Sequence, residues 1–86
     1  MAGDLKAVKT RGNLEGRYAN YFKVGYNAYE FVIDFGQFYE GNQGAELYTR
    51  VITSPLYAKA LLKTLRASIQ NYEDSFGPIK EPGKGL

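Results

Sequence analysis

The sequence of 86 residues contains no cysteine and no histidine. The lack of cysteine excludes disulfide bonds, and the lack of both residue types removes the usual ligands of zinc. The same absences exclude nucleophilic sites of the Ser-His-Asp and Cys-His kinds. A small enzyme of this composition would rely on carboxylates or tyrosines, and we expect instead a protein that is not an enzyme and that uses no metal or other cofactor.

The net charge is small, and long hydrophobic runs are absent. A formal net charge of +2 is too small to indicate nucleic-acid binding by itself. No stretch approaches the 18 apolar residues of a membrane span, and the first residues lack the apolar segment of a secretory signal. These absences predict a cytoplasmic protein that does not associate with membranes.

Apolar and aromatic residues are plentiful, at 44% and 15% of the chain. This content excludes a disordered protein. A domain of this size buries only about 60% of the surface that its unfolded chain exposes, so its own core is marginal. Disulfides, a metal or a partner chain commonly stabilise such small domains, and the first two are excluded here. Self-association is the remaining solution.

A long helix is predicted from Ser54 to Gly77. Ser54 is a good N-cap, and Pro55 suits the first helical position. Gly77 can adopt the left-handed conformation that ends a helix, and Pro78 prevents its continuation. Apolar residues at spacings of three and four form one stripe on this helix: Ala58, Leu61, Leu62, Leu65, Ile69, Tyr72 and Phe76.

Three strands are predicted before the helix. Residues 20–26 and 29–35 alternate between two faces and are joined at Asn27 and Ala28, as in a hairpin. Residues 45–53 are rich in β-branched side chains, with Leu47, Thr49 and Val51 expected on one face. Residues 36–44 contain three glycines and predict a loop or a distorted hairpin tip. Phe38 and Tyr39 then either fold back over the edge of the core, which we favour, or contact a partner.

Together these elements predict an α+β domain, with an antiparallel sheet of about three strands packed against one long C-terminal helix. The domain is expected over residues 18–79, between a flexible basic arm at 1–17 and a disordered tail at 80–86. One helix covers only one face of such a sheet, and the sheet has two open edges. A two-fold homodimer, formed by edge pairing or by sheet stacking, would protect both.

The charged side chains include one pair of carboxylates and one stripe of basic residues that could have a function. Glu30 and Asp34 share a strand face but lie roughly 13 Å apart, too far for the carboxylate pair of an inverting glycosidase. Lysines and an arginine at helical spacing form a basic stripe, which is commonly a solvated surface. The leading hypothesis is a homodimeric binding or adaptor module. The alternative is a protein that binds a single-stranded nucleic acid through the basic stripe, Lys23 and the tyrosines of the sheet. The candidate contacts for a protein partner or a nucleic acid are Lys23, Phe38, Tyr39, Lys59, Lys63 and Arg66.

Two segments carry a family resemblance. Residues 29–37 read YEFVIDFGQ, and residues 50–79 read RVITSPLYAKALLKTLRASIQNYEDSFGPI. These segments resemble small prokaryotic proteins of the family called domain of unknown function 3467. The resemblance spans roughly residues 18–79 and implies a complete domain. It implies no activity and assigns no functional residue.

Overall fold

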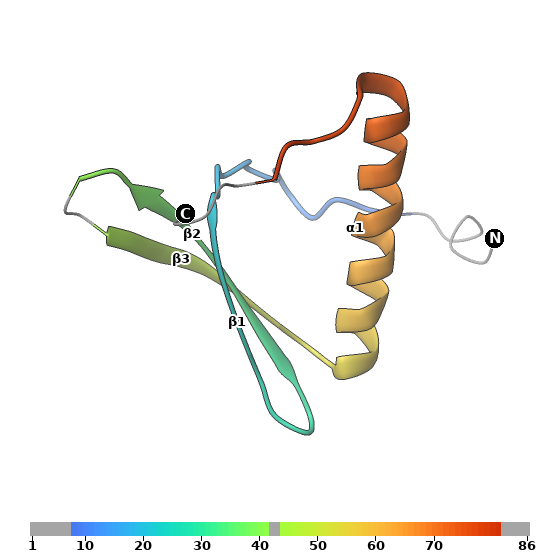
Figure 1. The fold of residues 1–86 in the computed structure, drawn as a ribbon. Coiled ribbons are helices and arrows are strands. Elements are labelled where there is room, and N and C mark those ends of the chain that lie inside the picture. The colour runs from blue at the N-terminus through green and yellow to red at the C-terminus, as the bar shows by residue number, and fades with distance from the viewer. Residues whose placement is uncertain (1–7, 42–43, 82–86) are drawn as a thin grey trace.

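Three antiparallel strands and one helix make up the protein in the computed structural model, which describes residues 8–41 and 44–81 (Figure 1). The strands pair in the order β1-β2-β3. This arrangement confirms the predicted three-stranded antiparallel sheet followed by a C-terminal helix. The bounds of the elements are β1 (Tyr21–Tyr26), β2 (Phe31–Tyr39), β3 (Gly44–Thr53) and α1 (Pro55–Phe76).

The turn between β1 and β2 is organised by Asn27, as its sequence position predicted. The Asn27 side-chain oxygen accepts hydrogen bonds from the backbone N–H groups of Tyr29 at 2.7 Å and Glu30 at 3.0 Å. Asparagine stabilises tight turns in this way because its side chain mimics a backbone acceptor. Since both N–H groups are used in the turn, β2 begins at Phe31 and not at Tyr29.

Two alternatives were predicted for residues 36–44, a loop or a distorted hairpin tip. The loop is wrong, because β2 continues through Gly36 to Tyr39 and pairs there with β3, whereas the irregular pairing at Phe35 and Gly36 agrees with a distorted hairpin. Phe35 pairs with Thr49, but the next residue, Gly36, pairs with Leu47, so that Tyr48 is an extra residue in β3. This β-bulge moves Leu47 to the opposite face from Thr49, and the predicted grouping of Leu47 with Thr49 is therefore also wrong. Gly36 is suited to this position because it lies close to the backbone of β3, whereas a larger residue would collide with it.

The predicted ends of α1 are confirmed. The Ser54 hydroxyl accepts a hydrogen bond from the Tyr57 N–H at 3.2 Å, and Pro55 is the first helical residue. The helix ends at Gly77 as predicted, and the Gly77 N–H donates to the Glu73 carbonyl at 2.9 Å. Gly77 has φ 97° and ψ 170°, an extended glycine conformation and not the predicted left-handed helical one. The helix therefore begins and ends where local side-chain chemistry places it.

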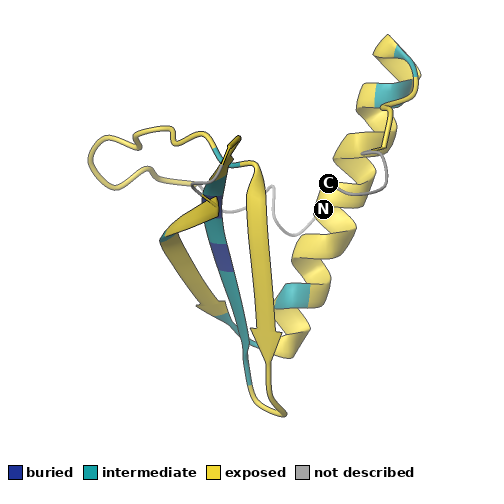
Figure 2. Ribbon diagram, turned by 60° about the vertical axis from the view of Figure 1, so that its left-hand side comes forward, coloured by how far each residue is buried: buried dark blue, intermediate teal, exposed yellow. Residues whose placement is uncertain are grey.

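The sheet and α1 form a V that is joined at Ser54, where β3 runs directly into the helix (Figure 1). No side chain of α1 is buried, and Figure 2 shows that β2 is the least exposed element. Within residues 8–41 and 44–81, only Asp34 and Gly36 are buried. The sequence predicted close packing of the helix on the sheet, whereas α1 of one chain does not pack closely on the sheet of that chain.

The dimensions of the chain agree with this open arrangement. Its radius of gyration is 15.9 Å. A compact domain of the same length would have a radius of gyration of about 12 Å. The separation of α1 from the sheet and the exposed segment before β1 both contribute to the difference.

Candidate functional site

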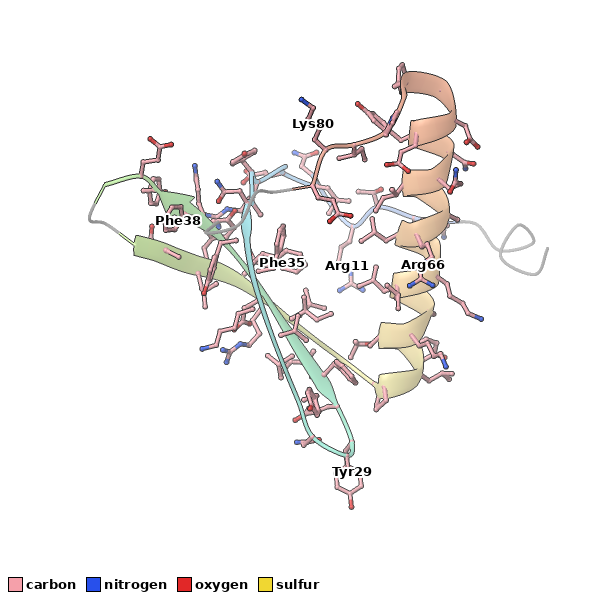
Figure 3. The ribbon with its side chains drawn as sticks, viewed as in Figure 1. Arg11, Tyr29, Phe35, Phe38, Arg66 and Lys80 are labelled. Atoms are coloured by element: carbon pink, nitrogen blue, oxygen red, sulfur yellow. The ribbon has the colours of Figure 1, made fainter. Side chains whose placement is uncertain are left out.

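The sheet face that turns toward α1, here called the inner face, is mostly apolar. The register of β1 and β2 pairs Phe22 with Phe35, Val24 with Ile33, and Tyr26 with Phe31 on this face. The Phe22 and Phe35 rings meet edge to face with centroids 5.8 Å apart. Figure 3 shows the Phe35 side chain pointing into the V. Cross-strand contacts thus order these rings without covering them, because Phe22 remains 57% exposed.

An apolar groove lies where the inner face approaches the first turns of α1. Its volume is about 510 Å³, and it is lined by Val24, Phe31, Ile33, Pro55, Ala58, Lys59 and Leu62. Lys59 is the one charged residue among these seven. Toward the wide end of the V, the apolar stripe of α1 stays exposed, with Leu65 at 54% and Ile69 at 41%. Inner face and stripe together form an extensive apolar surface, larger than soluble monomers normally leave in water.

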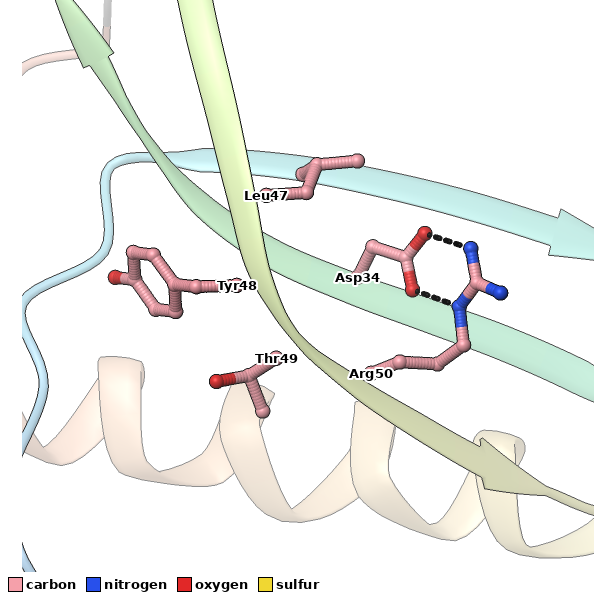
Figure 4. A pocket seen from close by; sticks show the side chains of 5 residues that line it. All are labelled: Asp34, Leu47, Tyr48, Thr49 and Arg50. Carbon is pink, nitrogen blue, oxygen red and sulfur yellow. Dashed lines mark hydrogen bonds and ion pairs between the residues drawn. The ribbon is translucent and has the colours of Figure 1, made fainter.

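The opposite, outer face of the sheet carries an ion pair between β2 and β3 (Figure 4). Arg50 Nε donates to Asp34 Oδ1 at 2.7 Å, and Arg50 Nη2 donates to Asp34 Oδ2 at 2.9 Å. Asp34 is 5% exposed, whereas the Arg50 side chain is 63% exposed. This bidentate geometry orients both side chains and leaves much of the guanidinium accessible to solvent.

The hydrogen bond from Arg50 lowers the pKa of Asp34. Partial burial of the carboxyl opposes this effect, while the positive charges of Arg50 and Lys23 lower the pKa further. Asp34 is therefore ionised at neutral pH and stabilises the pairing of β2 with β3. A carboxylate held in this state is not suited to act as a general acid.

We expect Asp34→Asn to lower the melting temperature at pH 7, and we expect the difference from the wild type to disappear in acid. The pKa of Asp34 is lower in the folded chain than in the unfolded chain, so its stabilisation is complete above the unfolded value of about 3.9. The stabilisation is lost as the pH falls through the lower, folded value. Thermal unfolding from pH 7 to pH 2 measures this effect. Glu40→Gln, which changes an exposed acid, is the control and should unfold at the same temperature as the wild type at every pH. A difference in melting temperature between D34N and the wild type that does not change with pH would contradict the assigned role of Asp34.

The basic residues proposed as nucleic-acid contacts do not lie on one common surface of the chain. Lys23 precedes Val24 in β1 and so lies on the outer face, across the sheet from α1. Lys59, Lys63 and Arg66 all lie on α1, and Lys59 lines the apolar groove. A nucleic-acid strand that follows the helix therefore does not meet Lys23, and the predicted combination of the basic stripe with Lys23 has no common surface in one chain.

Phe38 and Tyr39 lie at the end of β2 and not on a loop. Adjacent strand residues point to opposite faces, so Phe38 lies on the outer face with Asp34. Phe38 is 50% exposed (Figure 3). Asn20 holds the backbone here, because its side-chain oxygen accepts from the Phe38 N–H at 2.7 Å. The favoured fold-back from a loop is therefore wrong, whereas a role of Phe38 or Tyr39 in partner contact stays a prediction.

No pattern in the sequence predicts the contact between the N-terminal segment and the bulge. The Tyr48 hydroxyl donates to the Tyr18 carbonyl, and the Arg17 guanidinium lies 3.9 Å from the centre of the Tyr48 ring. This cation–π contact and hydrogen bond attach the segment before β1 to β3. The predicted flexibility of residues 1–17 and disorder of residues 80–86 stay predictions, and residues 1–7 and 82–86 lie outside the described ranges.

Two other kinds of site are absent from the described part of the chain. Residues 8–41 and 44–81 contain no group of three or more acidic, histidine or cysteine side chains arranged to hold a metal ion. In the same ranges, no helix has both the length and the hydrophobicity needed to cross a membrane. The two sides of the V and the outer face are thus the candidate interaction surfaces.

A protein-family model described as "Protein of unknown function (DUF3467)" matches residues 3–81. The chain belongs to this family. Membership confirms the resemblance carried by residues 29–37 and 50–79, and the match covers nearly the whole chain. No curated protein and no solved structure matched this DUF3467 protein.

Proposed function

We propose that this DUF3467 protein is a homodimeric, non-enzymatic binding or adaptor module. The observation that carries the proposal is the simultaneous exposure of two complementary apolar surfaces, the inner face and the stripe of α1. Burial of apolar surface is the main favourable contribution to folding, and one chain leaves most of this contribution unused. A second copy supplies the missing contacts without any further component.

The exposed area supports an extensive interface. The chain exposes 8277 Å². A compact monomer of 9.6 kDa exposes about 5,100 Å², which leaves an excess of about 3,200 Å² per chain and about 6,400 Å² for two chains. Obligate homodimers bury 2,000–5,000 Å² or more in total, so the excess is sufficient for such an interface.

The outer face supports the binding role, because a dimer that covers the inner face leaves the outer face free. Arg50 is oriented by Asp34 and is largely exposed. Phe38 and Ile52 lie on the same face and are 50% and 59% exposed. Aromatic and arginine side chains are enriched at protein interfaces, so this surface suits a protein partner.

The first test is the absolute mass in solution, measured by light scattering over a dilution series. We expect twice the chain mass of 9.6 kDa at high micromolar concentration. The mass should stay at that value on dilution to low micromolar, as expected for an obligate dimer. A monomer mass throughout the series would contradict the proposal.

A further inference from the structure

We infer that the V of each chain is occupied by α1 of a second copy, with the partner's stripe against the inner face. The inference rests on the proposed homodimer and assigns its geometry. In this arrangement each chain gives its helix to the other chain and receives the other helix in return. The same surface residues thus serve both chains, as a two-fold interface requires.

The occupant of the V must be apolar and elongated. Six of the seven residues that line the groove are uncharged, and the side chains of all six are apolar. β2 has nine residues and α1 has 22. These lengths correspond to roughly 30 Å of strand and 33 Å of helix, so a second helix matches the length of the inner face. The stripe of α1 is the exposed apolar surface of this shape on the described chain.

Closure of α1 onto its own sheet is opposed by the corner at Ser54. Only this residue separates Thr53 of β3 from Pro55 of α1. Pro55 fixes its own φ and restricts Ser54 to the extended conformation that it adopts, with φ −81° and ψ 162°. The Ser54 cap also depends on this conformation. Insertion of a partner helix requires no change at the corner, whereas closure within one chain requires the cap to rearrange.

Pairing of two chains through the sheet edges would leave the apolar surface uncovered. An edge contact satisfies the free backbone groups of β1 or β3 but buries neither Val24 and Ile33 nor the stripe. Reciprocal insertion buries both. The apolar surface therefore favours insertion of the helix over edge pairing.

The test is a set of cross-linking experiments between two chains of different length, each carrying one introduced cysteine. The natural chain has no cysteine, so every link is defined. Val24→Cys on the tagged chain is mixed in turn with Leu61→Cys, Leu65→Cys or Ile69→Cys on the untagged chain, and a short bis-maleimide reagent is added. Ala60→Cys and Ala67→Cys, on the other side of α1, are the matched controls. The mass of each mixture is measured before the reagent is added.

We expect a dimer mass, a tagged–untagged product with at least one stripe variant, and a yield at least about tenfold lower with both controls. A dimer mass without such a product, or with equal yields from the controls, would overturn the inserted helix and leave the homodimer standing. A monomer mass would overturn both. Isotope-filtered NMR on a mixture of labelled and unlabelled natural chains provides a second measurement without substitutions, in which contacts between inner-face aromatic protons and Leu or Ile methyl groups must arise between chains.

Discussion

Leu65→Asp is expected to dissociate the dimer, raising its dissociation constant at least about 100-fold. Leu65 lies at the middle of the stripe and is 54% exposed in one chain. An isolated chain would tolerate the change, because substitutions at exposed positions usually alter stability by about 0.5 kcal/mol or less. In the proposed interface the carboxylate would be buried without a partner, which costs several kcal/mol.

Ala60→Asp is the matched control for this substitution. It introduces the same charge at an exposed position on the other side of α1, and aspartate lowers helix propensity at both sites. Light scattering measures the dimer, and circular dichroism measures the helix content. Equal dissociation of L65D and A60D would assign the effect to helix propensity. Two variants that both stay dimeric would place the stripe outside the interface.

The ends of α1 were predictable because they depend on neighbouring residues. Ser54 and Pro55 define the start, and Gly77 defines the end, through hydrogen bonds and dihedral angles within a few residues. The Asn27 turn was predictable for the same reason, since its side chain bonds to N–H groups two and three residues later. Local chemistry of this kind can be read directly from a sequence.

The extension of β2 was not predictable, because the role of Gly36 depends on a distant strand. A glycine that permits the close approach of another backbone looks the same in a sequence as a glycine that permits a turn. The extra residue of the bulge, Tyr48, could not be recognised from the sequence either. A bulge requires only that two residues of one strand lie opposite one residue of the neighbouring strand, and many residue types can fill those positions. The alternation of side chains therefore gave the right faces for Thr49 and Val51 and the wrong face for Leu47.

The candidate interaction surface was predictable in composition but not in position. The spacing of the stripe and the alternation of β2 identified apolar surfaces on both elements. The angle between them is set by the corner at Ser54, and a sequence pattern contains no information on that angle. The separation of Lys23 from the basic residues of α1 has a different cause, because strand alternation places Lys23 on the face away from the helix once Val24 is known to face it.

Gly36→Ala is expected to destabilise the protein by about 3 kcal/mol and to lower its melting temperature by roughly 10–20 °C. An added Cβ at this position would lie 2.9 Å from Leu47 Cα and still closer to the Glu46 carbonyl oxygen. Both neighbours are backbone atoms of β3, and a change of side-chain rotamer cannot relieve the overlap. The two strands would have to separate at the bulge, which breaks the pairing beyond Phe35.

Gly25→Ala is the control, because an added Cβ at Gly25 meets no atom within 4 Å and this glycine does not have a positive φ. It should be neutral or slightly stabilising, since alanine restricts the unfolded chain more than glycine does. Thermal and urea unfolding of both variants measure the difference. The same stability for G36A and G25A would mean that the strands do not approach closely at Gly36. The register would then differ beyond the bulge, and the placement of Leu47 on the outer face with Asp34 would have to be abandoned.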